Sequence, residues 1–324
     1  MRKLFVLGGI FFCLFGMTAV DSPAADFPTK PIECVVGFAS GGSTDTVFRV
    51  VAPIASEVLK QPVVIINKPG AGSALGANFV AKSKPDGYTL THFNISSCIL
   101  NAIQFNTGWD AIRDFEPVSN FVSLANILVV PSTSKITSVA EYVQAAQKNP
   151  DKIVSGSSGI GSSQHFSLEI FKKIANVQIT HAPYKGSTPC VIDLLGGHID
   201  SGFINASDVI EHIRAGKLRA LAVTMSKRLA DLPNVPTIAE SGFPGYEVVS
   251  WIGVAAPAKT PAEIVETLAN AFKKAMDSPD VQKKMTSLLN IPDYMPPREF
   301  KAFVKKEYDK YMGIAKASNI RAPQ

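Results

Sequence analysis

Residues 32–59 read IECVVGFASGGSTDTVFRVVAPIASEVL, and this stretch decides the fold. Residues 32–38 form a short apolar run, which is typical of a buried strand. From Thr44 to Leu59 apolar side chains recur every three or four positions, which predicts a helix. Pro53 inside that helix is expected to kink it. A strand that leads through a loop of glycine and hydroxyl residues into a helix is the beginning of a parallel α/β sheet.

The same alternation of strands and helices continues along the chain. Ser138 with Glu141 and Thr260 with Glu263 form capping boxes, which mark the starts of two helices. The pattern predicts the α/β class, with mostly parallel sheets flanked by helices. Further strands are predicted at 63–66, 88–93, 127–130, 153–155, 201–204 and 218–223, with helices between them and three more helices after residue 260.

Length and composition exclude several classes of protein. The chain has 324 residues, which favours two domains, and its 46% hydrophobic and 18% charged residues are typical of a globular protein. The net charge of +5 is spread out without a run of like charges, so a nucleic-acid partner is not expected. The four cysteines form no C-x-x-C pair, which argues against a zinc framework or a thioredoxin motif.

The N-terminus has the layout of a secretory signal peptide. Arg2 and Lys3 precede an apolar run at 4–17, and small residues follow it. Cleavage is predicted after Ala24 or Ala25. The run is too short for an ordinary membrane span, which needs ~20 apolar residues. The mature protein is therefore expected in the periplasm.

Three loops, at 38–45, 67–73 and 156–163, are rich in glycine and hydroxyl residues, and each joins a strand to a helix. The N-terminus of a helix presents unpaired backbone N–H groups and the positive end of the helix dipole. Such a site holds a carboxylate or phosphate without a lysine. One loop alone is as easily a tight turn with a capped helix, but three together favour an anion site.

The loops lack the motifs of enzymes. The segment from Gly156 to Ser163 has no P-loop lysine, no G-x-S-x-G elbow occurs, and the five histidines have no metal-binding spacing. No catalytic residue, metal or cofactor is therefore expected. His165 either contacts a ligand or makes local hydrogen bonds. Asp45 is interpreted as a helix N-cap, because a carboxylate there would repel an anion and is better placed to hold the loop.

The ordered motifs of the chain resemble those of the periplasmic receptors of tripartite tricarboxylate transporters, also called Bug-type receptors. The resemblance covers nearly all of the chain after the signal peptide. The motifs are FPTKPI at 27–32, the loop at 38–45, QPVV at 61–64 with NKPGAG at 67–72, KPDGYTL at 84–90, GIGSSQH at 159–165, YKG at 184–186, DLLGG at 193–197, RALAV at 219–223, VPTIAESG at 235–242, PAKTPAE at 257–263 and SPDV at 278–281.

The resemblance implies the two-lobed, type II-like fold of periplasmic binding proteins, with the ligand in the cleft between the lobes. The implied division is a first lobe at 26–125, a second lobe at 126–249, and a return to the first lobe with C-terminal helices at 250–324. Hinges are expected near 122–130 and 247–254. The residues implied to hold the ligand are Phe38, Ser40, Gly41, Gly42, Thr44 and Asp45 in the first lobe and Ser157, Ser162, Ser163, His165 and Asn205 in the second.

The resemblance also implies the function. Such receptors bind small organic carboxylates and deliver them to integral-membrane permease subunits, and this one is expected to be a monomer. Ile204 stands where many relatives have an aspartate, which disfavours an amino-acid ligand. Two alternatives stay open: a sensory receptor that presents the same ligand to a membrane signalling partner, and a secreted hydrolase, which would need a catalytic base beside an oriented nucleophile.

Overall fold

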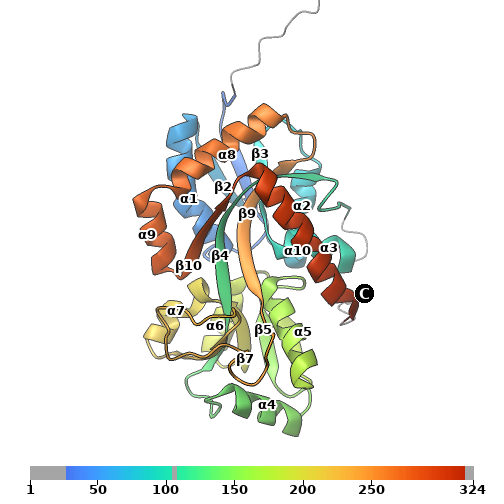
Figure 1. The fold of residues 1–324 in the computed structure, drawn as a ribbon, viewed down its shortest axis with the longest axis vertical. Coiled ribbons are helices and arrows are strands. Elements are labelled where there is room, and N and C mark those ends of the chain that lie inside the picture. Colours follow the sequence, from blue (N-terminus) through green and yellow to red (C-terminus); the bar gives the residue numbers. More distant parts are fainter. Residues whose placement is uncertain (1–26, 104–107, 318–324) are drawn as a thin grey trace, which may run out of the picture.

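A computed structural model describes residues 27–103 and 108–317, which form two lobes joined by long strands (Figure 1). The predicted signal peptide lies outside the described residues. The strands are β1 (Ile32–Val36), β2 (Val63–Asn67), β3 (Thr89–Phe93), β4 (Phe115–Pro131), β5 (Val154–Ser157), β6 (Thr180–Pro183), β7 (Ser201–Asn205), β8 (Leu218–Val223), β9 (Val249–Pro257) and β10 (Asn290–Met295). The helices are α1 (Ser43–Leu59), α2 (Ala74–Ala81), α3 (Ile95–Ile103), α4 (Val139–Lys148), α5 (Ser163–Ala175), α6 (Ser187–Leu195), α7 (Ala206–Arg214), α8 (Ala262–Met276), α9 (Pro279–Ser287) and α10 (Pro297–Ala317), with a short 3₁₀ turn at Ala71–Ser73.

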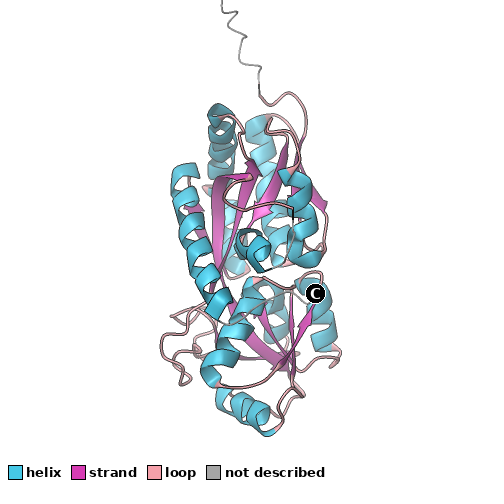
Figure 2. Ribbon diagram, turned by 90° about the vertical axis from the view of Figure 1, so that its right-hand side faces the viewer, coloured by secondary structure: helices cyan, strands magenta, loops and turns pink. Residues whose placement is uncertain are grey.

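The first lobe is built on β1, which pairs in parallel with β2 and β3. β9 then pairs antiparallel with β3 and β4, and β10 adds to β4. One face packs on α1 and α8 through Phe48, Phe121 and Phe272, whose neighbouring rings lie 5.5 Å and 5.2 Å apart. Helices cover both faces of this sheet (Figure 2).

The second lobe has β5 in parallel between β6 and β7, while β7 and β8 pair antiparallel with β4. Its core includes the fully buried side chains of Tyr142, Phe171 and Phe203. The α/β class is therefore confirmed. Both sheets are mixed rather than mostly parallel, because strands that enter from the other lobe run against the parallel set.

β4 is the strand that connects the lobes. Up to Ala125 it pairs with β9 of the first lobe, and from Asn126 it pairs with β7 of the second. We therefore propose the division of the chain near residue 125 that the sequence implied. α10 adds a contact between the lobes, since the Tyr311 ring lies 5.1 Å from that of Phe166 on α5.

Two local predictions about helices have clear outcomes. At α4, the Ser138 hydroxyl accepts the Glu141 N–H at 3.2 Å, which confirms that the helix is capped there. The predicted capping box at Thr260 is wrong, because its hydroxyl donates to the Pro257 carbonyl and α8 begins without a side-chain cap. α1 is one uninterrupted helix with Pro53 inside it.

Candidate functional site

A small cavity lies between the lobes, and five helices begin at its wall. They are α1 and α3 from the first lobe and α5, α6 and α7 from the second. The cavity measures about 20 Å³, room for roughly one water molecule. A larger ligand therefore enters only when the lobes separate. The lining residues are Phe38, Gly42, Ser43, Thr44, Asn94, Ile95, Ser96, Ser158, Ser162, Ser163, Ser187, Asn205, Ser250 and Ile252.

Hydrogen bonds across the cleft hold the lobes together around this cavity. The Ala39 N–H donates to the Lys185 carbonyl at 3.0 Å, and the Asn205 amide donates to the Ser43 hydroxyl at 2.6 Å. Gly186 makes the approach possible, because a Cβ there would lie only 2.9 Å from the Ala39 nitrogen, and its φ of 146° favours glycine. The structure is thus a closed form of the cleft.

Asp45 organises the loop before α1, but the prediction that it is an N-cap is wrong. The N-cap position is Gly42, and Asp45 is the third residue of the helix. Its carboxylate reaches back to accept the Gly41 N–H at 2.9 Å, the Arg49 Nε–H at 2.8 Å and the Asn67 amide at 2.9 Å. One carboxylate therefore fastens the loop to its own helix and to the end of β2.

The Asp45 carboxylate stays ionised in this setting. Burial alone would raise its pKa, but hydrogen bonds from Arg49, Gly41 and Asn67 outweigh burial and lower the pKa below the usual value. Asp45 is buried yet does not line the cavity. Its negative charge is therefore neutralised by its partners and kept away from the cavity wall.

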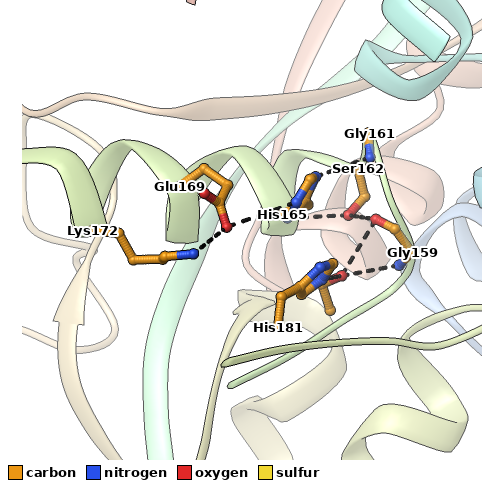
Figure 3. Close-up of polar contacts among 8 residues, drawn as sticks. Gly159, Gly161, Ser162, His165, Glu169, Lys172 and His181 are labelled. Atoms are coloured by element: carbon orange, nitrogen blue, oxygen red, sulfur yellow. Dashed lines mark hydrogen bonds and ion pairs between the residues drawn. The ribbon is translucent and has the colours of Figure 1, made fainter. Parts of the chain in front are cut away.

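The loop before α5 is held by two stacked histidines (Figure 3). The His165 and His181 rings lie 4.2 Å apart, and His165 Nδ1 accepts the Gly161 N–H at 3.1 Å. His181 shares a 2.6 Å hydrogen bond with the Ser157 hydroxyl. The Ser162 hydroxyl caps α5 by accepting the His165 N–H at 3.2 Å. His165 therefore makes the local hydrogen bonds that were one of its two predicted roles.

The contact between Ser157 and His181 has the atoms of a nucleophile and its base, a pairing that the sequence did not reveal. Ser157, however, is fully buried and does not line the cavity. Its hydroxyl is therefore not exposed to the cavity in this structure. The pair therefore supports the loop.

Both histidines are neutral at physiological pH. Burial lowers the pKa of His181 to about 4, with a further contribution from Lys172. Burial, His181 and Lys172 lower the pKa of His165 well below its usual value. Protonation of either histidine would place a buried positive charge against the ring that stacks on it. Acid is therefore expected to loosen the loop before α5.

Replacement of His181 by glutamine is expected to weaken the acid sensitivity of folding. Because the pKa is lower in the folded than in the unfolded state, the unfolded chain binds the proton first as pH falls below ~6.5. The wild type is then expected to lose about 2 kcal/mol more than His181→Gln between pH 7.5 and 5. Urea unfolding at both pH values measures this. His198→Gln, at an exposed histidine, is the control, and equal losses in wild type and His181→Gln would contradict the expectation.

The structure divides the eleven predicted site residues into two groups. The five that do not line the cavity make hydrogen bonds within the loops. These are Ser40, Gly41, Asp45, Ser157 and His165. The six that line the cavity are Phe38, Gly42, Thr44, Ser162, Ser163 and Asn205.

Several residues that line the cavity were not predicted from the sequence. Ser43 and Ser158 lie inside the predicted loops but were not singled out, and Ser250 comes from β9. No long glycine-rich loop precedes α3 or α6. The sequence marks the starts of these two helices only by a hydroxyl or amide residue just after a strand or turn. The predicted loop at 67–73 does not line the cavity. It supports the third loop instead, since a Cβ on Gly159 would lie 3.2 Å from the Gly72 Cα.

The cavity wall is polar but carries no charged side chain. Five helix N-termini bring the positive ends of their dipoles to one place, and hydroxyl and amide groups add hydrogen-bond donors. Apolar contact comes from Phe38, Ile95 and Ile252. Among the described residues there is no cluster of metal-ligating side chains and no helix long and apolar enough to cross a membrane. Such a wall suits a small organic anion.

Comparison with known proteins agrees with this chemistry. Residues 47–320 match the model of the "Tripartite tricarboxylate transporter family receptor". The chain belongs to this family. Its members are periplasmic solute-binding receptors rather than enzymes. The protein BugT of Bordetella pertussis is 32% identical over 323 residues, covering 99% of each chain.

Two similar solved structures contain carboxylates. A protein of Rhodopseudomonas palustris solved with adipate is 35% identical, with a TM-score of 0.87 over 91% of this chain and 99% of the other. MatC from the same organism, with bound malate, is 29% identical, with a TM-score of 0.85 over 89% and 99%. The two-lobed fold of periplasmic binding proteins is thereby confirmed for this family receptor.

Proposed function

We propose that the protein captures a small organic carboxylate in the periplasm and delivers it to the membrane subunits of a tripartite tricarboxylate-type secondary transporter. The observation that carries the proposal is the convergence of five helix N-termini on one uncharged, hydroxyl-rich cavity. The relatives that hold adipate and malate add support. Export after cleavage at Ala24 or Ala25, a monomeric state and the absence of catalysis belong to the same proposal.

The mechanism follows from the two-lobed arrangement. A ligand that touches α1 and α3 on one side and α5, α6 and α7 on the other gains all its contacts only in the closed form. It therefore shifts the population from open to closed by the difference in its affinity for the two. The Ser43–Asn205 contact across the cleft marks where the lobes meet around the ligand. No bond of the ligand needs to break.

A screen of carboxylates by thermal shift tests the function, beginning with adipate and malate. A ligand present at 100 times its Kd is expected to add about 2.7 kcal/mol of stability, because it binds the folded form only. The methyl ester of each ligand that is found is the matched control and is expected to give no shift, since the ester lacks the charge that the helix N-termini hold. Equal shifts from acid and ester, or ligands without any carboxylate, would contradict the proposal.

A further inference from the structure

A second cavity lies away from the cleft, on the first lobe, between α10 and the segment that leads into β4. It measures about 410 Å³, within the range of roughly 300–1,000 Å³ that is usual for the sites of small molecules. We call it the α10 groove. Its wall on the side of β4 is apolar throughout and consists of Ala111, Ile112, Phe115 and Pro117.

This apolar wall is held in place by its own contacts. Phe115 is 2% exposed and packs edge to face on Trp109, with the ring centroids 5.4 Å apart. The Asp110 carboxylate accepts the N–H groups of Ile112 at 3.0 Å and Arg113 at 2.8 Å. These hydrogen bonds fix the turn that carries Ile112, which is 42% exposed. A ligand in the groove would therefore cover apolar surface that otherwise meets water.

The wall formed by α10 carries three cations. Arg298, Lys301 and Lys305 are spaced three and four residues apart, so they lie on one face of the helix, along roughly 10 Å of its length. Ala302 and Val304 are the other α10 residues in this wall. No acidic side chain among the described residues lines the groove. An apolar surface with cations along one side suits a molecule that has a hydrocarbon body and an anionic end.

Acidic residues outside the groove pair with two of these cations. Lys301 contacts Glu116 at 2.8 Å, and Lys305 contacts Asp309 at 2.5 Å. The two lysine side chains are 60% and 58% exposed. Ion pairs between exposed side chains contribute little, so a carboxylate in the groove can compete for either lysine. Arg298 has no ion-pair partner in the described part of the chain, and its guanidinium can bind both oxygens of a carboxylate.

We propose that the α10 groove is a second binding site, for an amphiphilic monocarboxylate with a medium-length hydrocarbon chain. The chain covers Ile112 and lies along the apolar wall, and the carboxylate faces Arg298, Lys301 and Lys305. The size of the groove favours a small molecule over a protein helix, which is about 10–12 Å wide with its side chains. The central cavity differs, because its wall carries no charged side chain.

The α10 groove is formed by the first lobe alone. Its ligand therefore needs no closure of the cleft and no contact with the second lobe. The inference is independent of the proposed function, since it holds whether or not the central cavity binds a carboxylate.

Calorimetric titration of the purified protein with hexanoate, octanoate and decanoate, each below its micelle concentration, tests the proposal. Binding is expected to strengthen about fourfold for each added methylene that the groove buries. 1-Octanol has the same chain length as octanoate but no charge. It is expected to bind at least about tenfold more weakly, because the charge-assisted hydrogen bonds to α10 are lost.

Variants at exposed positions separate the contributions of the chain and of the carboxylate. Ile112→Asn is expected to weaken octanoate binding about fivefold, because part of the apolar contact is lost. The triple variant Arg298→Gln, Lys301→Gln and Lys305→Gln is expected to weaken it at least about tenfold while keeping the gain for each methylene. Lys306→Gln, at an exposed α10 residue outside the groove, is the matched control and is expected to bind octanoate as the wild type does.

Several results would overturn the proposal. These are no binding of octanoate or decanoate, equal affinities for octanoate and 1-octanol, or an octanoate affinity that neither Ile112→Asn nor the triple variant changes. Octanoate that loses affinity in Ser163→Asp but not in Ile112→Asn lies in the central cavity, which also contradicts the proposal. Binding to vesicles of phosphatidylglycerol without binding of free octanoate would make the groove a membrane contact instead. A failed carboxylate screen at the central cavity contradicts the proposed function alone.

Discussion

Asp45→Ala is expected to lower the free energy of unfolding by about 3 kcal/mol, because a buried carboxylate with several partners disappears at once. The Gly41 N–H and the Asn67 amide each lose an acceptor. Asn67 also donates to the Phe38 carbonyl at 3.1 Å, so its position holds the first loop to β2. Urea unfolding at pH 7 measures the loss. We also expect weaker ligand binding, since Phe38 and Gly42 line the cavity.

Two matched variants show which contacts of Asp45 matter. Arg49→Ala removes the ion-pair partner of Asp45 together with its 3.0 Å hydrogen bond to the Asn67 side-chain oxygen. Because the Arg49 side chain is 49% exposed, the change is expected to cost less than about 1 kcal/mol. Asp45→Asn keeps the shape of the side chain and some of its hydrogen bonds. Its loss of unfolding free energy is therefore expected to lie between the losses of Arg49→Ala and Asp45→Ala. A loss from Asp45→Ala as small as that from Arg49→Ala would contradict the role of Asp45 in holding the loop.

Ser163→Asp is expected to weaken carboxylate binding by at least about 100-fold while leaving the fold intact. Ser163 is the first residue of α5 and lines the cavity. A carboxylate there is favourable for the helix, because it lies at the positive end of the dipole. The same carboxylate repels an anion ~4 Å away by about 4 kcal/mol at an effective dielectric constant of 20.

Calorimetric titration with the acid that gives the largest thermal shift measures the effect of Ser163→Asp. The side chain introduced by Ser163→Asn has nearly the same shape as that of Ser163→Asp but no charge. Ser163→Asn is expected to weaken ligand binding less than about tenfold, since only one hydroxyl contact is lost. Similar affinities for Ser163→Asp and Ser163→Asn would show that no anion lies near the start of α5.

Much of the fold could be predicted from local patterns. The strand at Leu218–Val223 matches the structure, and α1 begins one residue before the predicted start. The long strand β4 was recognised only at its end, because Pro117, Asn120 and Ser123 interrupt its apolar pattern. In the structure these residues lie beside β9 or β10, and the Asn120 amide donates to the Asp293 carbonyl at 2.8 Å. Such partners are distant in the sequence and leave no local signal.

The candidate site was predictable where glycine and serine make a loop conspicuous. The starts of α1 and α5 were found in this way, whereas those of α3 and α6 were not. Asn94, which precedes α3, accepts the Ser97 N–H at 3.2 Å, a local cap that any helix may have. That α3 and α6 face the same cavity depends on the order of the strands and on closure of the lobes.

A crystal structure of the protein with the carboxylate found by the screen tests the central claim most directly. The ligand is predicted to lie between the lobes, with carboxylate oxygens accepting hydrogen bonds from backbone N–H groups in the first turns of helices of both lobes, among them α1 and α5. Its remaining atoms are predicted to contact Phe38, Ile95 or Ile252. A ligand bound outside this cavity, or one whose carboxylate is held by a lysine or arginine side chain instead, would contradict the account.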